Sequence, residues 1–296
     1  MTEMPAWKKE MDAPRLKRLE DLFSVAKPVI GMVHLWPLPG APGYLGDTRG
    51  HGMKRIVEEA LREAESLVAG GVDGLIVENM WDLPFRVGAA VQFEAATAQA
   101  VAAAEVVKAC GKLPVGINVI HNGGVTCLAI ALAAGARFIR VCIFTGARVW
   151  DTGEFDHGCA AELLRRRKEL DAEHIHVFAD VDKKHSVAFP GIDLATHISW
   201  TEFYGADALI VSGKMTADAP DPDDLREARR LARKPILIGS GADERNIAAF
   251  LEFADGVIVG SSLKRDGVME NPVDPERVRR FVAAARSARG ARAARP

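Results

Sequence analysis

Pro235-Ile-Leu-Ile-Gly239-Ser240-Gly241 and Gly256-Val-Ile-Val-Gly260-Ser261-Ser262 are two short apolar runs that each end in small residues. Each run predicts a fully buried strand whose carboxyl end opens into a tight turn. Glycine and serine add little bulk there, so the backbone N–H groups of the turns can approach an anion closely. Two such turns after the last two strands form the commonest phosphate site of the (β/α)8 barrel. The pair therefore predicts that fold and a phosphorylated small-molecule ligand.

Eight apolar, β-branched runs alternate with helical patterns along the chain. The strands are predicted at residues 28–34, 72–79, 114–121, 138–144, 176–181, 208–212, 235–239 and 256–260. The helices are predicted at residues 53–69, 91–109, 126–134, 160–172, 194–204, 222–232, 244–252 and 275–285. Runs that are apolar throughout indicate strands buried on both faces, as in parallel sheets. Strict alternation fits a doubly wound sheet or a barrel, and the eight repeats favour a single (β/α)8 TIM barrel.

Two further features favour the barrel over the doubly wound sheet. Short turns such as Gly205-Ala206-Asp207 join several helices to the next strand, as at the floor of a barrel. No Gly-x-Gly-x-x-Gly follows the first strand, so a dinucleotide-binding half is not supported. We therefore expect an N-terminal extension over residues 1–24, with a helix over 15–25 that caps the floor. The barrel is expected over residues 25–285, and an Ala/Arg-rich tail over 286–296.

Composition excludes several classes of protein. The chain has 296 residues, 48% of them apolar, and a net charge of −2, so nothing in the global charge points to nucleic acid. An arm formed by the arginines of the tail is the remaining nucleic-acid or anionic-membrane hypothesis, but their pattern favours a frayed final helix. The four cysteines have no CxxC or zinc-ligand spacing, which is typical of free thiols in a reducing compartment. No secretory signal or membrane-spanning run is present. We expect a cytoplasmic protein, and the Ala-rich outer helices indicate a homo-oligomer.

Long loops are predicted at one end of the barrel only. They follow the first, fourth, fifth and sixth strands, over residues 35–52, 145–157, 182–192 and 213–221. Polar residues end the strands at the same end: His34, Glu78, Asn79, Asn118, His121, Asn122, Arg140, Asp180, Lys183, Lys184, His185 and Ser212. A core rarely gathers so many polar and ionisable groups at one end, so this convergence predicts an active site.

Two carboxylates are the leading catalytic candidates. Glu78 and Asp180 end the second and fifth strands, and we expect them to face each other across the barrel mouth. They can act as acid and base on opposite faces of a substrate, or hold a divalent metal, the one cofactor that the sequence leaves open. For Glu78 the structural alternative is a salt bridge to Arg140 or Lys183. Arg140 lies in a buried strand and needs a partner, either Glu78 or the substrate.

The other polar residues have supporting roles in this interpretation. Asn118, His121 and Lys184 would orient hydroxyls and stabilise negative charge, with His185 beside them as a proton carrier. His121 has a structural alternative, a hydrogen bond to a loop carbonyl. His34, Asn79 and Arg140 are expected to contact substrate under the loops. A Schiff-base lysine is disfavoured, because both candidate lysines lie beyond the end of their predicted strand.

The phosphate site is expected to combine three strand ends. Its predicted residues are Gly239, Ser240, Gly241, Gly260 and Ser261, with Ser212 and Gly213 as a weaker third contribution. The alternative is that these turns need small residues only for packing. No Walker pattern, Gly-x-Ser-x-Gly elbow or His-Glu-x-x-His is present, so P-loop, serine-hydrolase and zincin chemistry are not supported.

The first predicted strand continues as Gly31-Met-Val-His34-Leu-Trp-Pro-Leu-Pro-Gly40-Ala-Pro42. With Gly71-Val-Asp-Gly-Leu-Ile-Val-Glu78-Asn79 and Ala179-Asp180-Val-x-x-Lys184-His185, this string resembles the BtpA/SgcQ family over about residues 22–285. The resemblance implies a barrel of the ribulose-phosphate-binding superfamily. One branch of that family is associated with photosystem I accumulation, and others sit beside sugar-utilisation genes. Phe189-Pro190-Gly191 departs from the more polar loop expected in relatives.

Two classes of function follow. The first is an enzyme that acts on a pentose phosphate or a nucleoside-derived sugar phosphate, by carboxylate acid–base or metal-assisted chemistry. Isomerisation, epimerisation and cleavage of a C–N or C–C bond are all compatible with it. The second is a non-catalytic assembly or stability factor for a membrane photosynthetic complex, as in photosystem I biogenesis.

Overall fold

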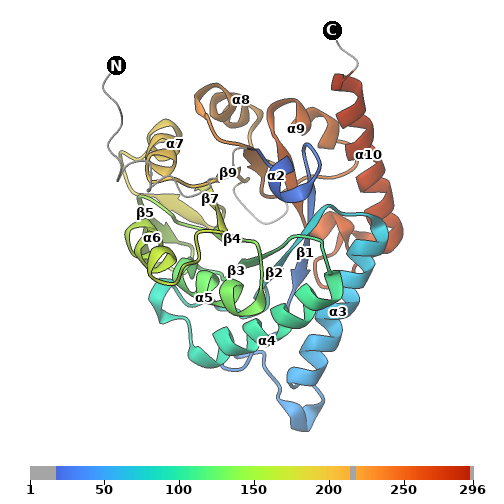
Figure 1. Ribbon diagram of the computed structural model, residues 1–296. Coiled ribbons are helices and arrows are strands. Elements are labelled where there is room, and N and C mark those ends of the chain that lie inside the picture. The colour runs from blue at the N-terminus through green and yellow to red at the C-terminus, as the bar shows by residue number, and fades with distance from the viewer. Residues whose placement is uncertain (1–17, 214–217, 294–296) are drawn as a thin grey trace.

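The computed structural model describes residues 18–213 and 218–293 and shows a closed barrel of eight parallel strands (Figure 1). Around the barrel the strand order is β1-β11-β10-β9-β7-β4-β3-β2. These strands are β1 (Val29–His34), β2 (Gly74–Glu78), β3 (Val115–Asn118), β4 (Phe138–Val141), β7 (His176–Asp182), β9 (Ala208–Val211), β10 (Ile236–Ile238) and β11 (Gly256–Val259). All eight lie within or overlap the predicted runs, so the predicted (β/α)8 barrel is confirmed.

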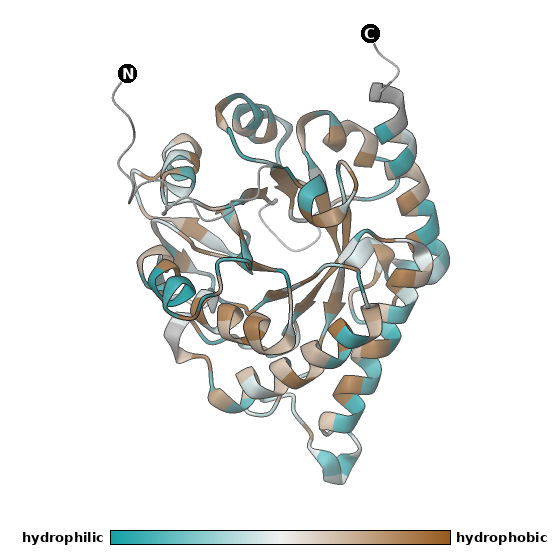
Figure 2. Cartoon of the chain, viewed as in Figure 1, coloured by the Kyte–Doolittle hydropathy of each residue, from teal (hydrophilic) through white to brown (hydrophobic). Residues whose placement is uncertain are grey.

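Helices surround the barrel on its outer side (Figure 1). They are α3 (Met53–Gly70), α4 (Phe93–Cys110), α5 (Gly124–Ala134), α6 (Ala160–Glu169), α7 (Leu194–Phe203), α8 (Pro222–Leu231), α9 (Ile247–Phe253) and α10 (Pro275–Ala293). The strands appear mostly brown in the hydropathy view, whereas polar teal is concentrated on the outer helices (Figure 2). Burial of the apolar strands between the barrel interior and this helical layer is the main stabilising term. Within the described ranges, no helix combines the length and apolar character needed to cross a membrane.

The floor of the barrel is closed by α2 (Glu20–Phe23) and an aromatic cluster. The Phe23 ring meets Phe138 edge-on at 5.5 Å between centroids, and Phe138 stacks on Phe178 at 4.8 Å. Gly116 makes room for this plug, since a Cβ there would lie 2.3 Å from the Phe138 ring. Because large side chains fill the floor, the polar ends of the strands can form a site only at the opposite mouth. Most of the predicted N-terminal extension lies outside the described residues.

The last helix is longer than its sequence pattern predicts. The sequence predicts a helix to about residue 285 and favours a frayed continuation over the tail, and α10 continues as a regular helix to Ala293. Arg286 donates to the Gly71 carbonyl at 3.3 Å, and Arg289 pairs with Asp73. These partners lie at the floor turn between α3 and β2, so the arginines that resembled a free basic arm fasten the helix to the barrel. Residues 294–296 lie outside the described part of the chain.

A second, three-stranded antiparallel sheet lies beside the barrel mouth. It is built from β5 (Ala147–Trp150), β6 (Phe155–His157) and β8 (Ser186–Ala188), in the order β6-β5-β8. These residues come from the loops after β4 and β7, which the sequence predicts only as long loops. The strands are three or four residues long, too short for an alternating pattern to identify them. Four short 3-10 turns complete the described elements: η1 (Asp47–Arg49), η2 (Gly88–Ala90), η3 (Ser261–Leu263) and η4 (Arg265–Gly267).

Candidate functional site

Two adjoining cavities open at the carboxyl ends of the barrel strands. The larger has a volume of about 540 Å³ and is walled by the loops after β2, β3 and β7 and by the hairpin β5–β6. The smaller, about 40 Å³, lies against the turns after β10 and β11. Four residues line both: Glu78, Met80, Arg140 and Lys184. A ligand with one end at the glycine-serine turns would therefore extend past these side chains into the larger cavity.

Arg140 and Asp180 form a buried ion pair at the base of the mouth. Arg140 Nε donates to Asp180 Oδ2 at 3.0 Å, and its Nη2 donates to Asp180 Oδ1 at 2.8 Å. Burial opposes ionisation of Asp180, but Arg140 and the nearby lysines outweigh it and hold the pKa of Asp180 below its ordinary value. The structure thus corrects two expectations. Arg140 pairs with Asp180 rather than with Glu78. Asp180 is held by the two hydrogen bonds from Arg140 and is therefore not a free carboxylate opposite Glu78.

Glu78 and His34 lie side by side at the ends of β2 and β1. They are register partners, and His34 Nε2 lies 3.9 Å from Glu78 Oε1. Burial, together with Lys264 and Lys184, places the pKa of His34 well below its ordinary value, so the imidazole is neutral at pH 7. Both residues line the smaller cavity, and Glu78 reaches the larger one as well. Glu78 is therefore a carboxylate that both cavities share.

Lys184 lies on a tightly held turn between β7 and β8. The Lys183 carbonyl accepts from Ser186 Oγ at 2.8 Å and Arg148 Nη2 at 3.2 Å, and the His185 carbonyl accepts from the Asp151 amide at 2.9 Å. Burial, then repulsion by Lys183 and Arg140, lowers the pKa of Lys184 to about 8, although Glu78 and Asp180 oppose this. Among the described residues, no carboxylate lies within 4 Å of the Lys184 ammonium. Lys184 thus presents a partly deprotonated amine to both cavities.

Aromatic rings form the far wall of the larger cavity. His121 stacks on Trp150 with 3.7 Å between centroids and 5° between planes, and Phe85 packs at 4.9 Å on His121. Burial, with Lys183 as a further cause, lowers the pKa of His121 to about 3, so the ring is neutral. At the rim, His185 Nδ1 lies 3.0 Å from Asp151 Oδ2. His121 and His185 therefore line the cavity, His121 as part of an aromatic wall rather than as a charged group.

Two predicted asparagines have structural partners. Asn118 is fully buried beneath the mouth, where its Nδ2 donates to the Arg140 carbonyl at 3.0 Å. Asn79 accepts from the Ile120 amide at 2.8 Å, and its Nδ2 donates to Asp82 and to the Ile120 carbonyl. Neither lines the two cavities of the mouth. The structure does not place Asn118 against a substrate, and Asn79 braces the loops after β2 and β3.

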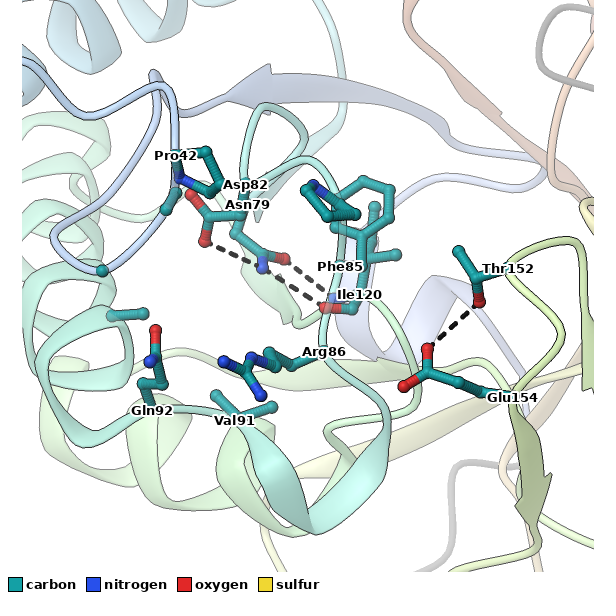
Figure 3. Close-up of a pocket in the computed structure, with 14 residues that line it drawn as sticks. Pro42, Asn79, Asp82, Phe85, Arg86, Val91, Gln92, Ile120, Thr152 and Glu154 are labelled. Carbon is teal, nitrogen blue, oxygen red and sulfur yellow. Dashed lines mark hydrogen bonds between the residues drawn. The ribbon is translucent and has the colours of Figure 1, made fainter.

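Asn79 instead lines a neighbouring cavity of about 410 Å³, shown in Figure 3. Dashed lines in Figure 3 show the hydrogen bonds of Asn79 on one side of this cavity and the Thr152–Glu154 hydrogen bond on another. This cavity and the larger cavity of the mouth share four lining residues: Pro84, Phe85, Ile120 and Thr152. The loop after β2, which the sequence does not single out, thus forms a wall of two cavities.

The glycine-serine turns after β10 and β11 line the smaller cavity with all five of the residues for which the sequence predicts phosphate contacts: Gly239, Ser240, Gly241, Gly260 and Ser261. Within the described ranges, the amides of Ser240, Gly241 and Ser261 have no hydrogen-bond partner. The Gly239 amide, in contrast, donates to the Val211 carbonyl at 2.8 Å. Gly239 is required for its small size, because a Cβ there would lie 2.3 Å from Ser212 Oγ and 3.2 Å from Arg140 Nη2.

The third predicted contribution to the phosphate site has other partners. Ser212 Oγ donates to Asp180 Oδ1 at 3.3 Å, and the Gly213 amide donates to Ser240 Oγ at 3.2 Å. Ser240 Oγ in turn donates to the Asp218 carbonyl at 2.9 Å. Ser212 and Gly213 therefore support the site from below, and the Ser240 hydroxyl fastens the loop after β9 while its amide remains available. Lys214 of the same loop lies outside the described residues.

The structure contains a buried ion pair behind the turn after β11 that the sequence does not predict. Lys264 is 1% exposed and pairs with Glu63 of α3, whose Oε2 also accepts from the His34 amide at 3.0 Å. Burial raises the pKa of Glu63 despite Lys264. The pair ties the turn after β11 to α3 and β1. Nothing in the local sequence distinguishes Lys264 or Glu63 from surface residues on a loop and a helix.

The residues present do not form a complete metal site. Within the described part of the chain, no group of three or more His, Cys, Asp or Glu side chains is arranged to hold a metal ion. Of the two candidate ligands, Asp180 is already engaged by Arg140. The donor set left at the mouth is Glu78 with His34, and a cation there would also face Lys184 and Arg140. The residues at the mouth therefore do not favour a bound divalent metal ion.

Known proteins with similar sequences identify the family of this chain. The sequence model of the BtpA family matches residues 25–287. The chain belongs to the BtpA family. A relative named photosystem I biogenesis protein BtpA, from Synechocystis sp., is 43% identical over 267 residues, covering 88% of this chain and 89% of the relative. An uncharacterized protein from Thermococcus kodakarensis is 40% identical, covering 89% and 97%. These matches confirm the family resemblance over the barrel.

Solved structures share the barrel of this BtpA-family chain at low sequence identity. 3-Hexulose-6-phosphate synthase aligns with a TM-score of 0.54 and 18% identity, covering 87% of this chain and 99% of that one. N-(5'-phosphoribosyl)anthranilate isomerase from Pyrococcus furiosus aligns with a TM-score of 0.52 and 16% identity, covering 88% and 99%. At these identities the likeness shows the fold.

Proposed function

We propose that this BtpA-family protein is an enzyme that acts on a phosphorylated sugar by acid–base chemistry at the barrel mouth. One observation carries the proposal. Ser240, Gly241 and Ser261, whose amides have no hydrogen-bond partner among the described residues, line the same small cavity as Glu78 and Lys184. Converging backbone N–H groups form an anion site that needs no charged side chain. A phosphate on these turns would hold its sugar carbons beside a carboxylate and an amine.

The charges of the mouth suit a phosphorylated ligand. Arg140 remains fully ionised, with its charge shared between Asp180 and the cavity, and Lys184 adds a partial charge. The rings of His34 and His121 are neutral and add no positive charge of their own. Glu78 is proposed as the base and Lys184 as the group that donates a proton or stabilises negative charge on the substrate. This assignment replaces the Glu78–Asp180 pair expected from the sequence, because Asp180 is fixed by Arg140.

The neighbouring structures support the proposal only through their fold. The printed names of 3-hexulose-6-phosphate synthase and phosphoribosylanthranilate isomerase refer to phosphorylated sugars, and both share this barrel. A barrel places the turns after its last two strands beside the mouth whatever the reaction. The support for the anion site is therefore the three amides that lack a partner in the described part of the chain, together with the adjoining cavities that Glu78 and Lys184 share.

Thermal unfolding with ribulose 5-phosphate, ribose 5-phosphate and inorganic phosphate tests the proposal. A sugar phosphate at 100 times its Kd should stabilise the folded protein by about 2.7 kcal/mol. Ser261→Glu, which puts a negative charge at the turn, should abolish this stabilisation. Ser287→Glu, on the exposed side of α10, is the matched control and should retain it. If Ser261→Glu responds to the sugar phosphates as Ser287→Glu does, the anion site is not at these turns.

The assembly-factor hypothesis rests on the name of the Synechocystis relative and its 43% identity. Under that hypothesis the mouth has no ligand to bind, and the charge change at Ser261 would leave photosystem-related function intact. Loss of that function in Ser261→Glu, together with loss of sugar-phosphate binding, would join the two roles to one site.

A further inference from the structure

We propose that Lys184 forms a covalent imine with the carbonyl carbon of an aldose or ketose phosphate bound at the mouth. This inference rests on the proposed sugar-phosphate function and names the substrate class and the covalent step. The sequence disfavours a Schiff-base lysine because Lys184 lies beyond the predicted fifth strand. The structure reverses that argument, since the turn after β7 bends back over the mouth to pair β8 with β5.

The position of Lys184 is the first support. It lines both the small cavity at the glycine-serine turns and the larger cavity walled by His121 and Trp150. A sugar phosphate that spans the two cavities must pass this side chain. The neighbouring Lys183 lines only the larger cavity. The turn itself is held on both sides, by the bonds to the Lys183 and His185 carbonyls, so the amine is presented from a fixed backbone.

The second support is the charge environment of Lys184, which lies close to two buried cations, Lys183 and Arg140. Arg140 is paired with Asp180, and Lys264 with Glu63. In the described part of the chain, Lys184 has no carboxylate within salt-bridge distance. A buried amine beside another cation loses its proton more easily, which is one established way to activate a lysine nucleophile. With a pKa of about 8, roughly one molecule in ten carries the free amine at pH 7.

The covalent step balances with groups that the mouth provides. The Lys184 Nζ lone pair attacks the carbonyl carbon, and the C=O π pair moves to oxygen to give a carbinolamine. One proton is then added, the carbinolamine hydroxyl leaves as water, and a protonated C=N bond remains. Glu78, which lines the same cavities, can take a proton from the carbon next to the imine; the C–H electron pair forms a C=C bond, and the π pair of the C=N⁺ bond moves to nitrogen to give a neutral enamine. No oxidant, reductant or metal is required.

Borohydride trapping tests the imine directly. The full-length protein is incubated with dihydroxyacetone phosphate, ribulose 5-phosphate or ribose 5-phosphate, reduced with sodium borohydride and analysed by intact and peptide mass spectrometry. We expect a mass increase equal to the sugar phosphate less one oxygen atom, located on the peptide that contains Lys184. Lys184→Arg, which keeps the positive charge, should lose the adduct and still be stabilised by the same ligand. Lys183→Met should retain the adduct at Lys184.

Ribitol 5-phosphate separates this inference from the proposed function. It carries the phosphate but has no carbonyl, so it should stabilise the protein against heat without giving an adduct. Stabilisation by the carbonyl sugar phosphates without any trapped adduct overturns the imine and leaves the sugar-phosphate function standing. An adduct located on Lys183 or another lysine also overturns it. If neither ribitol 5-phosphate nor the carbonyl sugars bind, the proposed function fails and the imine fails with it.

Discussion

At the scale of single residues, the pairing of buried charges decides which groups can do chemistry. Asp180 is held by two hydrogen bonds from Arg140, which leaves Glu78 as the carboxylate exposed to both cavities. Lys184 is left without a close counter-ion among the described residues, and its pKa falls to about 8. The difference arises because the folded chain brings one carboxylate to Arg140 and none to Lys184. Two predictions concern these pairs.

The first prediction is that Lys184 reacts with acetic anhydride with a midpoint near pH 8, well below an ordinary lysine of pKa about 10.4. Mass spectrometry of the modified peptide against pH gives the midpoint. Lys183→Met removes a repelling charge and should raise the midpoint, whereas Glu78→Gln removes an opposing one and should lower it. A midpoint above pH 10 in the wild-type protein, or shifts of the reverse sign in these variants, would show that the amine is not perturbed as described.

The second prediction concerns the Arg140–Asp180 pair. Asp180→Ala leaves Arg140 buried without its partner and should cost about 3–5 kcal/mol of unfolding free energy, measured by urea denaturation. Arg140→Met combined with Asp180→Leu removes both charges and should cost less than either single change. A double variant as unstable as the sum of the two singles would contradict this coupling. The depressed pKa of Asp180 adds stability above about pH 4, which is lost as the pH falls through its folded value.

At the scale of elements, the turns after β10 and β11 and the small sheet over the mouth define the site. Gly241 has a φ of +70°, and a Cβ there would lie 2.2 Å from the Ala219 backbone nitrogen. Glycine is thus required both by the left-handed backbone and by the loop packed against it. The sheet of β5, β6 and β8 brings Trp150 to His121 and fixes the turn of Lys184. These contacts join segments that are distant in the sequence.

A matched pair of glycine substitutions tests the turn. Gly50 has a φ of +73° with no heavy atom within 4 Å of its Cβ position, so Gly50→Ala should cost only the backbone strain of about 1–2 kcal/mol. Gly241→Ala carries the same strain plus the clash with Ala219 and should cost more. It should also weaken sugar-phosphate binding, which Gly50→Ala should not. Urea unfolding and ligand titration check both effects, and equal costs for the two variants would mean that the clash is relieved by movement of the loop.

At the scale of the whole molecule, the barrel separates a stabilising floor from a polar mouth. Phe23, Phe138 and Phe178 fill the floor, and α10 with its arginines fastens the outer layer. The mouth contains buried histidines that stay neutral, His34 with its pKa well below the ordinary value and His121 with a pKa of about 3. These neutral histidines lower the unfolding free energy in acid, because the unfolded chain binds protons that the folded protein does not.

The corresponding prediction concerns stability between about pH 6.5 and pH 4. His121 has an ordinary pKa near 6.5 unfolded and about 3 folded, so its contribution to unfolding free energy is constant above pH 6.5 and falls below it. The slope approaches about 1.4 kcal/mol per pH unit for each neutral histidine. His121→Gln should flatten the pH dependence by that amount relative to wild type. The difference between the wild-type and variant curves cancels the contributions of Glu63 and Asp82. Their raised pKa values make the unfolding free energy change with pH in the opposite direction. Parallel wild-type and variant curves would show that His121 is protonated in the folded state.

Much of the fold follows from the sequence alone. Runs such as residues 256–260 are apolar, short and bounded by glycine, and those properties predict a buried parallel strand without reference to distant residues. The small residues at Gly239, Gly241 and Gly260 likewise indicate their turns locally. The sequence does not show how far the last helix continues past residue 285, because the partners of Arg286 and Arg289 lie in the turn before β2, more than two hundred residues away.

What the sequence by itself determined is the eightfold alternation, the end of the barrel that carries polar groups and the glycine-serine turns. Backbone conformation and burial pattern are set by neighbouring residues, so a linear pattern can report them. Only the tertiary structure decided that Asp180 is bound to Arg140, that Asn118 lies beneath the mouth and that Lys184 bends back over it. Pairing and pKa depend on distances between side chains from different strands, and closure of the barrel fixes those distances.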